Sequence, residues 1–298
     1  MLTLALPLVL ALTSVIPQSV PRDRAFWVGI IASKYEVPAG EKPFELLVDM
    51  DALLGSTDPV LRDDVAYGSA AQWISRKALL TPEQQKALLA KWTDNLAFKL
   101  GERDTDSVFR RSFSALNLSI LAARDIQAPF LSQPEFDTFL DRMLRYLEEE
   151  KDTRGFEKDK GWIHTPAHTA DVLKFLARNP RLSPAQQGRL LTAVSGKATA
   201  VGHTFTWGED ERLAQVIRSV ARRPDLDGAA FAAWLDPFGP AARQLWANGP
   251  SIDPDRLSAV QNMKSILRAA FTALSADTDL PPTAERARVQ ILKLVSGM

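Results

Sequence analysis

The chain has 298 residues, and its 36 lysine and arginine residues are balanced by 36 aspartate and glutamate residues, so the formal net charge is zero. This balance gives no electrostatic reason to expect binding to nucleic acid or to an anionic membrane surface. The chain has no cysteine, which excludes disulfides, cysteine-ligated metals and a thiol nucleophile.

The first 20 residues form an apolar run, and the first charged residues, Arg22 and Asp23, follow Pro21. Such a run is typical of a secretory signal peptide, although no lysine or arginine precedes it and no Ala-x-Ala motif marks a cleavage site. The alternatives are a buried first helix or a membrane anchor, and the run is short for a bilayer span. We predict a signal peptide over residues 1–20, a mature chain without a membrane span, and a periplasmic or secreted location.

From Arg22 onward, apolar residues recur at spacings of three and four, the pattern of helices that bury one face, and strand-like alternation is scarce. Proline after Ser, Thr or Asp marks helix starts, because proline is tolerated at the first helical position and the preceding side chain can cap. These signals predict helices that begin near Phe26, Phe44, Asp58-Pro59, Thr81-Pro82, Ser107, Ser132, Thr165-Pro166, Ser183-Pro184, Glu209, Asp253-Pro254 and Thr283.

Short stretches recur at a nearly constant spacing. Residues 175–180 resemble residues 219–224, and residues 64–69 resemble residues 107–112. A period near 40 to 47 residues with two helices per unit is the range of HEAT-like repeats, in which each hairpin buries its apolar stripe by stacking on its neighbours. Degenerate similarity between helices is the alternative. We predict a single all-α domain over residues 21–298, built of stacked helical hairpins that form a HEAT-like solenoid or a curved α/α array.

A charged segment interrupts this spacing at residues 148–160 and leads directly into Gly161-Trp162-Ile163-His164. A run of charges is usually a solvated surface. A long connection beside polar side chains is also where a helical array carries binding groups. The segment is therefore either solvated surface or the edge of a site.

Two of the three histidines, His164 and His168, follow this segment, and the third is His203. Thr165 and Pro166 predict an N-cap and a first helical residue, which places His168 at the third position with Asp171 one turn further on. The positive end of the helix dipole would keep His168 neutral, as a base or metal ligand must be. A structural role is the alternative, because the same pattern elsewhere in the chain is an ordinary capping box.

Three segments, Arg111–Leu116, Gly161–Asp171 and Glu209–Ala214, together resemble an uncharacterised bacterial family known only as a domain of unknown function. The family pattern is G-W-x-H-x-x-A-H-x-A-D after a helix with Arg-Ser-Phe. The resemblance covers about residues 60–235. It implies an all-α fold and a grouping of the three segments, and it implies no chemistry.

Our leading functional hypothesis is a binding or scaffold module for a protein, peptide or small molecule, as is common for helical repeats. Its pocket would lie around His164, His168, Asp171 and Glu209. The binding residues would be Arg110, Arg111, Trp162, His164, His168 and Asp171, with Asn117 on the same concave face.

Two enzyme hypotheses remain as alternatives. A zinc-type hydrolase would bind a divalent metal through His164, His168 and His203, with the fourth ligand or general base among Asp171, Glu209 and Asp210. A sugar-processing enzyme would instead use carboxylates close to tryptophans. Its candidates are Asp152, Asp171, Glu209 and Asp210 beside Trp162 and Trp207.

Overall fold

The computed structural model describes residues 22–245, 247 and 251–298. The predicted signal peptide lies outside these residues. Within them the fold is helical, and the strands are two residues long, so the predicted all-α class is confirmed. A search of the described helices found none with the length and apolar character needed to cross a membrane.

The helices follow one another along the chain, with the longest connection between α6 and α7 among the described residues. They are α1 Arg24–Ala32, α2 Pro43–Asp49, the 3₁₀ helix η1 Met50–Gly55, the π-helical turns η2 Val60–Tyr67 and η3 Ala71–Arg76 on either side of α3 Gly68–Ala70, α4 Pro82–Asn95, α5 Ser107–Gln127, α6 Gln133–Glu149, α7 Thr165–Arg178, α8 Pro184–Ala200, α9 Glu209–Ala221, α10 Gly228–Leu235, α11 Phe238–Leu245, α12 Pro254–Ser275 and α13 Pro282–Val295. The strands are β1 Phe156–Glu157 and β2 Gly161–Trp162.

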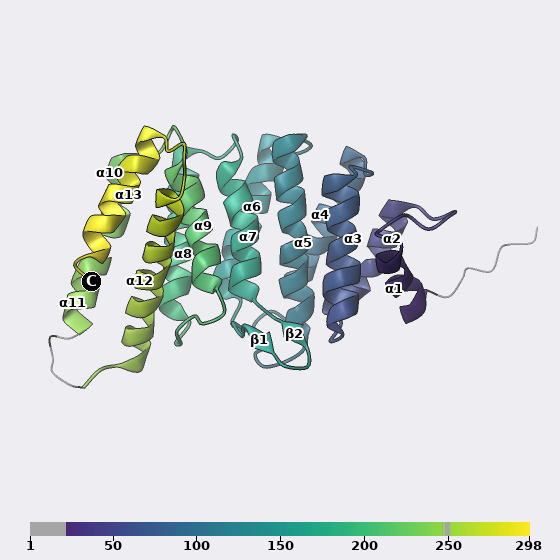
Figure 1. Ribbon diagram of the computed structural model, residues 1–298, viewed down its shortest axis with the longest axis horizontal. Helices are drawn as coiled ribbons and strands as arrows, with labels where there is room; N and C mark the ends of the chain where they lie inside the picture. Colours follow the sequence, from purple (N-terminus) through teal and green to yellow (C-terminus); the bar gives the residue numbers. More distant parts are fainter. Residues whose placement is uncertain (1–21, 246, 248–250) are drawn as a thin grey trace, which may run out of the picture.

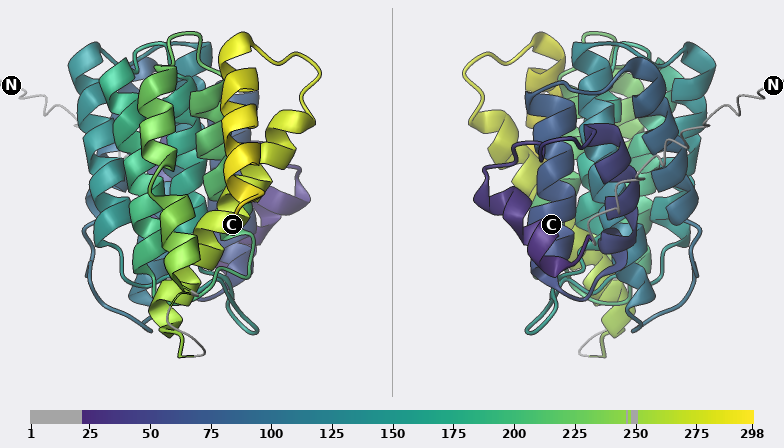
Figure 2. Two further views of the ribbon diagram at one scale, coloured as in Figure 1. Left: turned by 90° about the vertical axis from the view of Figure 1, so that its left-hand side faces the viewer. Right: turned by 90° about the vertical axis from the view of Figure 1, so that its right-hand side faces the viewer.

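The long helices stand side by side along the longest axis of the molecule (Figure 1). α5 packs on α7, α7 on α9, and α9 on α12, while α4, α6 and α8 pack against this row. Figure 2 shows the helices nearly parallel when the row is viewed from either end. Helical hairpins are therefore arranged in series around one continuous core, and the HEAT-like repeat itself stays a prediction.

Local capping signals fixed several helix starts as predicted. In each case the side chain of a Ser or Thr cap residue accepts a hydrogen bond from the backbone N–H of the residue three positions later. The side chain of that later residue accepts a hydrogen bond from the backbone N–H of the cap residue. These capping boxes are Thr81 with Gln84, Ser132 with Glu135, and Ser183 with Gln186.

The charged segment folds back on itself. β1 and β2 pair antiparallel with Phe156 opposite Trp162, and the pairing continues as the Ile163 amide donates to the Gly155 carbonyl at 2.8 Å. We call residues 150–164 the β-hairpin segment.

A buried arginine holds this segment against the helices. Arg62 donates to the carbonyl of Lys160 at 2.7 Å, and its guanidinium lies 4.2 Å and 4.5 Å from the ring centres of Phe109 and Phe113. A buried cation needs hydrogen-bond partners of this kind to be stable in the core. The β-hairpin segment is thus fixed to the body of the protein.

Candidate functional site

The start of α7 differs from the prediction. The helix begins at Thr165, and His164 occupies the cap position with a left-handed backbone (φ 56°). The Thr165 hydroxyl does not cap, because it donates instead to the carbonyl of Asp152 in the β-hairpin segment. His168 is therefore the fourth residue of the helix and not the third, and its amide donates to the His164 carbonyl at 2.9 Å.

Three aromatic side chains form a cluster at the surface beside this helix start. Phe156 lies 5.0 Å from Trp162 and 5.7 Å from Trp207 between ring centres, and the two tryptophans are 6.3 Å apart. Their exposed fractions are 38, 39 and 48%. Large aromatic side chains in mutual contact that stay exposed mark interaction sites. We call Phe156, Trp162 and Trp207 the aromatic platform.

A glycine makes room for one member of the platform. A Cβ atom at Gly155 would lie 2.1 Å from Cδ1 and 2.7 Å from Cβ of Trp207. Trp207 therefore lies directly on the backbone of Gly155, and any side chain at this position would displace it.

His164 lies behind the platform and joins its two halves. Its ring stacks on Trp162 at 4.7 Å with an interplanar angle of 20°, and its Nε2 donates to the Trp207 carbonyl at 2.9 Å. Glu209 approaches the same Nε2 at 3.9 Å and accepts from the Trp207 amide at 2.8 Å. Burial lowers the pKa of His164 against the opposing charge of Glu209. A neutral His164 thus ties the β-hairpin segment to the start of α9.

His168 is buried one layer deeper. The Ser112 hydroxyl donates to the carbonyl of Ile163, so the 2.8 Å contact between Ser112 Oγ and His168 Nδ1 requires the ring to donate. The ring also meets Phe113 edge to face at 4.9 Å. Burial holds the pKa of His168 well below its usual value. His168 is a neutral side chain that joins α5 to α7.

The third histidine is not brought to the other two. His203 is exposed on the connection between α8 and α9, and its Nδ1 donates to the carbonyl of Val201 at 3.1 Å. Within the described part of the chain, no group of three or more His, Asp or Glu side chains could hold a metal ion. The hypothesis that His164, His168 and His203 together bind zinc is therefore contradicted. The first two histidines are engaged in packing and hydrogen bonds, and the third lies on another connection.

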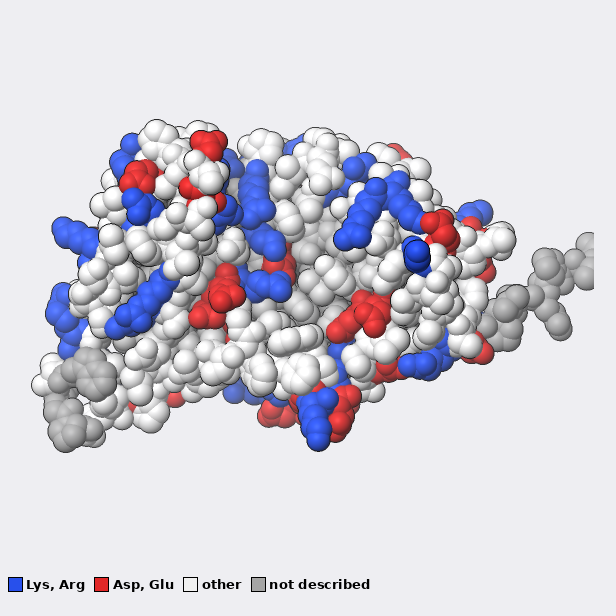
Figure 3. Space-filling view, viewed as in Figure 1, with Lys and Arg blue, Asp and Glu red and all other residues white. Residues whose placement is uncertain are grey.

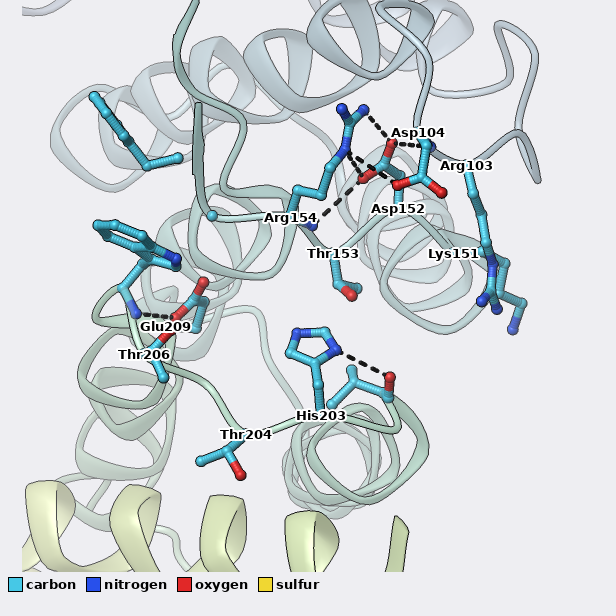
Figure 4. Close-up of a pocket in the computed structure, with 14 residues that line it drawn as sticks. Arg103, Asp104, Lys151, Asp152, Thr153, Arg154, His203, Thr204, Thr206 and Glu209 are labelled. Atoms are coloured by element: carbon cyan, nitrogen blue, oxygen red, sulfur yellow. Dashed lines mark hydrogen bonds and ion pairs between the residues drawn. The ribbon is translucent and has the colours of Figure 1, made fainter. Parts of the chain in front are cut away.

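A cavity of about 400 Å³ opens between the β-hairpin segment and the α8–α9 connection (Figure 4). Trp207 is among the residues that line it, and Figure 4 shows Glu209 on one side of the space and the Thr153 hydroxyl and the His203 ring on the other. The cavity thus adjoins the platform and brings together segments about 50 residues apart in the sequence.

The acidic candidates separate into different environments. Both Asp152 oxygens are engaged, by the Arg154 guanidinium and by the Asp104 amide. Asp171 forms ion pairs with Lys174 and Arg212 and is not among the residues that line the cavity.

The remaining two carboxylates begin α9. Glu209 is buried at the cavity wall, while its neighbour Asp210 is partly exposed. Of the predicted carboxylates, Glu209 alone combines a place at the cavity with direct contact to the platform.

The arginines predicted on a binding face are structural. Arg111 is fully buried and pairs at 2.5 Å with Glu150, the residue that follows α6. Arg110 donates to Asn95 at 2.9 Å and to Asp51 at 3.2 Å. Asn117 is also buried. The concave binding face assigned to these side chains is thus corrected.

Sequence reasoning missed Gly155 and Phe156 as members of this region, and it grouped Ser112 with the histidines through the family resemblance without assigning it a role. Phe156 is the single aromatic residue inside the charged segment, and Ser112 is part of the Arg-Ser-Phe motif. Both features are visible in the sequence. Their roles could not be inferred from it, because those roles depend on which distant residues Phe156 and Ser112 contact.

The model of the family described as "Protein of unknown function (DUF2785)" matches residues 96–271, more than half of the chain, and the chain belongs to this family. The resemblance predicted from three motifs is therefore confirmed at the level of an uncharacterised domain family. Comparisons with curated proteins and with solved structures found no match.

Proposed function

Starting from this family membership, we propose that the protein is a binding module outside the cytoplasm and that it takes up a peptide segment of a partner protein on the aromatic platform and in the adjoining cavity. The proposal is carried by one observation, the exposure of three mutually packed aromatic rings. The apolar run at the amino terminus supports the location.

The platform is built to be rigid before a ligand arrives. Trp207 rests on Gly155, Trp162 stacks on His164, and Arg62 fixes the β-hairpin segment from below. A preorganised surface loses little side-chain entropy on binding, so more of the favourable contact energy appears as affinity.

The chemistry of the site favours a basic side chain in the ligand. The faces of aromatic rings attract cations, and the buried Glu209 adds a negative charge at the cavity wall next to Trp207. A lysine or arginine of the peptide could place its aliphatic stem on the platform and its charged end near Glu209.

The test is selection of binding peptides from a displayed library with the full chain, followed by measurement of Kd for the selected peptides. We expect Trp162→Ala and Trp207→Ala to weaken binding by about tenfold or more, as for aromatic hot spots. The matched control is Val289→Ala, which removes an exposed apolar side chain on α13. Peptides that bind the tryptophan variants as tightly as the wild type would refute the proposal.

The enzyme hypotheses have less support. Hydrolysis of a glycoside by the common route needs two carboxyl groups facing the substrate. Asp152 is engaged with Arg154 and the Asp104 amide, which leaves Glu209 as the one predicted carboxylate that is available among the described residues lining the cavity. The separated histidines give the metal-dependent route no assembled ligand set among the described residues.

A further inference from the structure

Lys197 carries a buried charge without an acidic partner. The residue is 7% exposed, and its ammonium group donates to the backbone carbonyl of Glu150 at 2.8 Å. The Glu150 carboxylate itself accepts hydrogen bonds from the Arg111 guanidinium and the Asp152 amide. Among the described residues, no carboxylate lies within ion-pair distance of Lys197.

Two more cations lie near Lys197. Arg103 and Lys151 are exposed, and neither forms an ion pair with a described residue. Both residues line the cavity beside the platform, and Figure 4 shows them at its edge. Burial is the main cause that lowers the pKa of Lys197 to about 8; the charges of Lys151 and Arg103 act in the same direction, and those of Glu150 and Glu148 oppose them. The three positive charges therefore repel one another in the free protein.

All three cations line one groove, and two of them, Arg103 and Lys151, also line the cavity beside the platform. A groove of about 1050 Å³ runs between α6 and α8 and includes Lys197 in its lining. Arg103, Lys151 and Thr153 line both this groove and the cavity beside the platform. The Thr153 hydroxyl points into the cavity (Figure 4) and has no hydrogen-bond partner among the residues that the structure describes.

We propose that this groove binds the phosphate group of a small ligand through Lys197, Lys151 and Arg103, with Thr153, which also lines the groove, as a neutral donor. A phosphate carries a charge close to −2 and three strong acceptor oxygens, which matches several converging donors better than a single carboxylate does. Glu148 and Glu149 also line the groove, and Glu148 lies near enough to Lys197 to raise its pKa, so the anion is placed at the end of the groove that Arg103 and Lys151 line. The site is distinct from the aromatic platform and goes beyond the proposed function.

The experiment measures binding of inorganic phosphate to the full chain by calorimetry and by the shift in Tm, with sodium acetate and sodium chloride at equal ionic strength as comparisons. We expect saturable binding of phosphate alone, weakened by about tenfold or more in Lys197→Met and in Arg103→Met, because each removes a charged donor. Phenyl phosphate is the second probe. Tighter binding of the ester assigns the site to a phosphorylated molecule, and equal binding assigns it to free phosphate.

Controls separate loss of the site from loss of the fold. Lys197→Met removes an uncompensated buried charge, so this variant should melt at or above the wild-type Tm when phosphate is absent. Lys293→Met, at an exposed lysine of α13, should retain phosphate binding. The proposal is overturned if the wild type shows no saturable phosphate binding, or if Lys197→Met and Arg103→Met bind phosphate as the wild type does.

Discussion

Replacing Gly155 by alanine tests whether the backbone of the β-hairpin segment supports the aromatic platform. The new methyl group would lie 2.1 Å from Cδ1, 2.4 Å from Cγ and 2.7 Å from Cβ of Trp207. Rotation of the indole about its side-chain bonds does not relieve the contact with Cβ. The connection that carries Trp207 must therefore move away from the hairpin.

The size of the effect follows from two contributions. Overpacking of this kind costs about 1–3 kcal/mol. Movement of Trp207 also breaks the hydrogen bond from His164 to its carbonyl, which adds about 1 kcal/mol. We expect Gly155→Ala to lower the free energy of unfolding by about 2–4 kcal/mol.

The assay is urea denaturation combined in a double-mutant cycle with Trp207→Gly, which removes all three contacted atoms. In the Trp207→Gly background the cost of Gly155→Ala should fall by at least about 1 kcal/mol. Gly29→Ala is the matched control, because nothing lies within 4 Å of its Cβ position in α1, and it should stabilise by about 0.5–1 kcal/mol. An equal cost of Gly155→Ala in both backgrounds would refute the reasoning.

Three further predictions concern buried charges. Arg111→Met leaves Glu150 buried without its partner and should cost about 3–5 kcal/mol in urea denaturation, whereas adding Glu150→Gln should recover part of this loss; equal costs for the single and double variants would contradict it. The pKa of Lys197 in the folded protein, about 8, lies below the ordinary value of 10.5. Between these two pH values Lys197 is protonated in the unfolded chain and largely deprotonated in the folded protein. Wild-type stability should therefore rise by about 2 kcal/mol relative to Lys197→Met between pH 7 and pH 10, and a pH-independent difference in free energy of unfolding would count against the buried charge. The pKa of His168 is lowered by burial, so the unfolded chain binds its proton first as the pH falls below about 6.5. Stability should be lost on acidification from pH 7.5 to 5.5, and less so in His168→Gln, as measured by urea denaturation at the two pH values; identical losses would show that His168 is not the titrating group.

The sequence by itself determined the fold class and most helix starts. The capping boxes at Thr81 and Ser183 form as predicted, and the helix predicted after Ser132 begins there, because a cap needs only residues within one turn of each other. The three-and-four spacing of apolar residues likewise fixes which face of a helix is buried. Both signals are local, so they hold whatever the helix later packs against.

The hydrogen-bond partners and the burial of the polar residues in the family motifs depend on the tertiary structure. Thr165 had the local pattern of a cap, and the nearby Asp152 carbonyl took its hydroxyl instead. Ser112 and His168 meet across 56 positions of the chain, and Arg111 meets Glu150 across 39. A side chain becomes buried, paired or available to a ligand according to which distant element covers it, and local periodicity holds no information about that element.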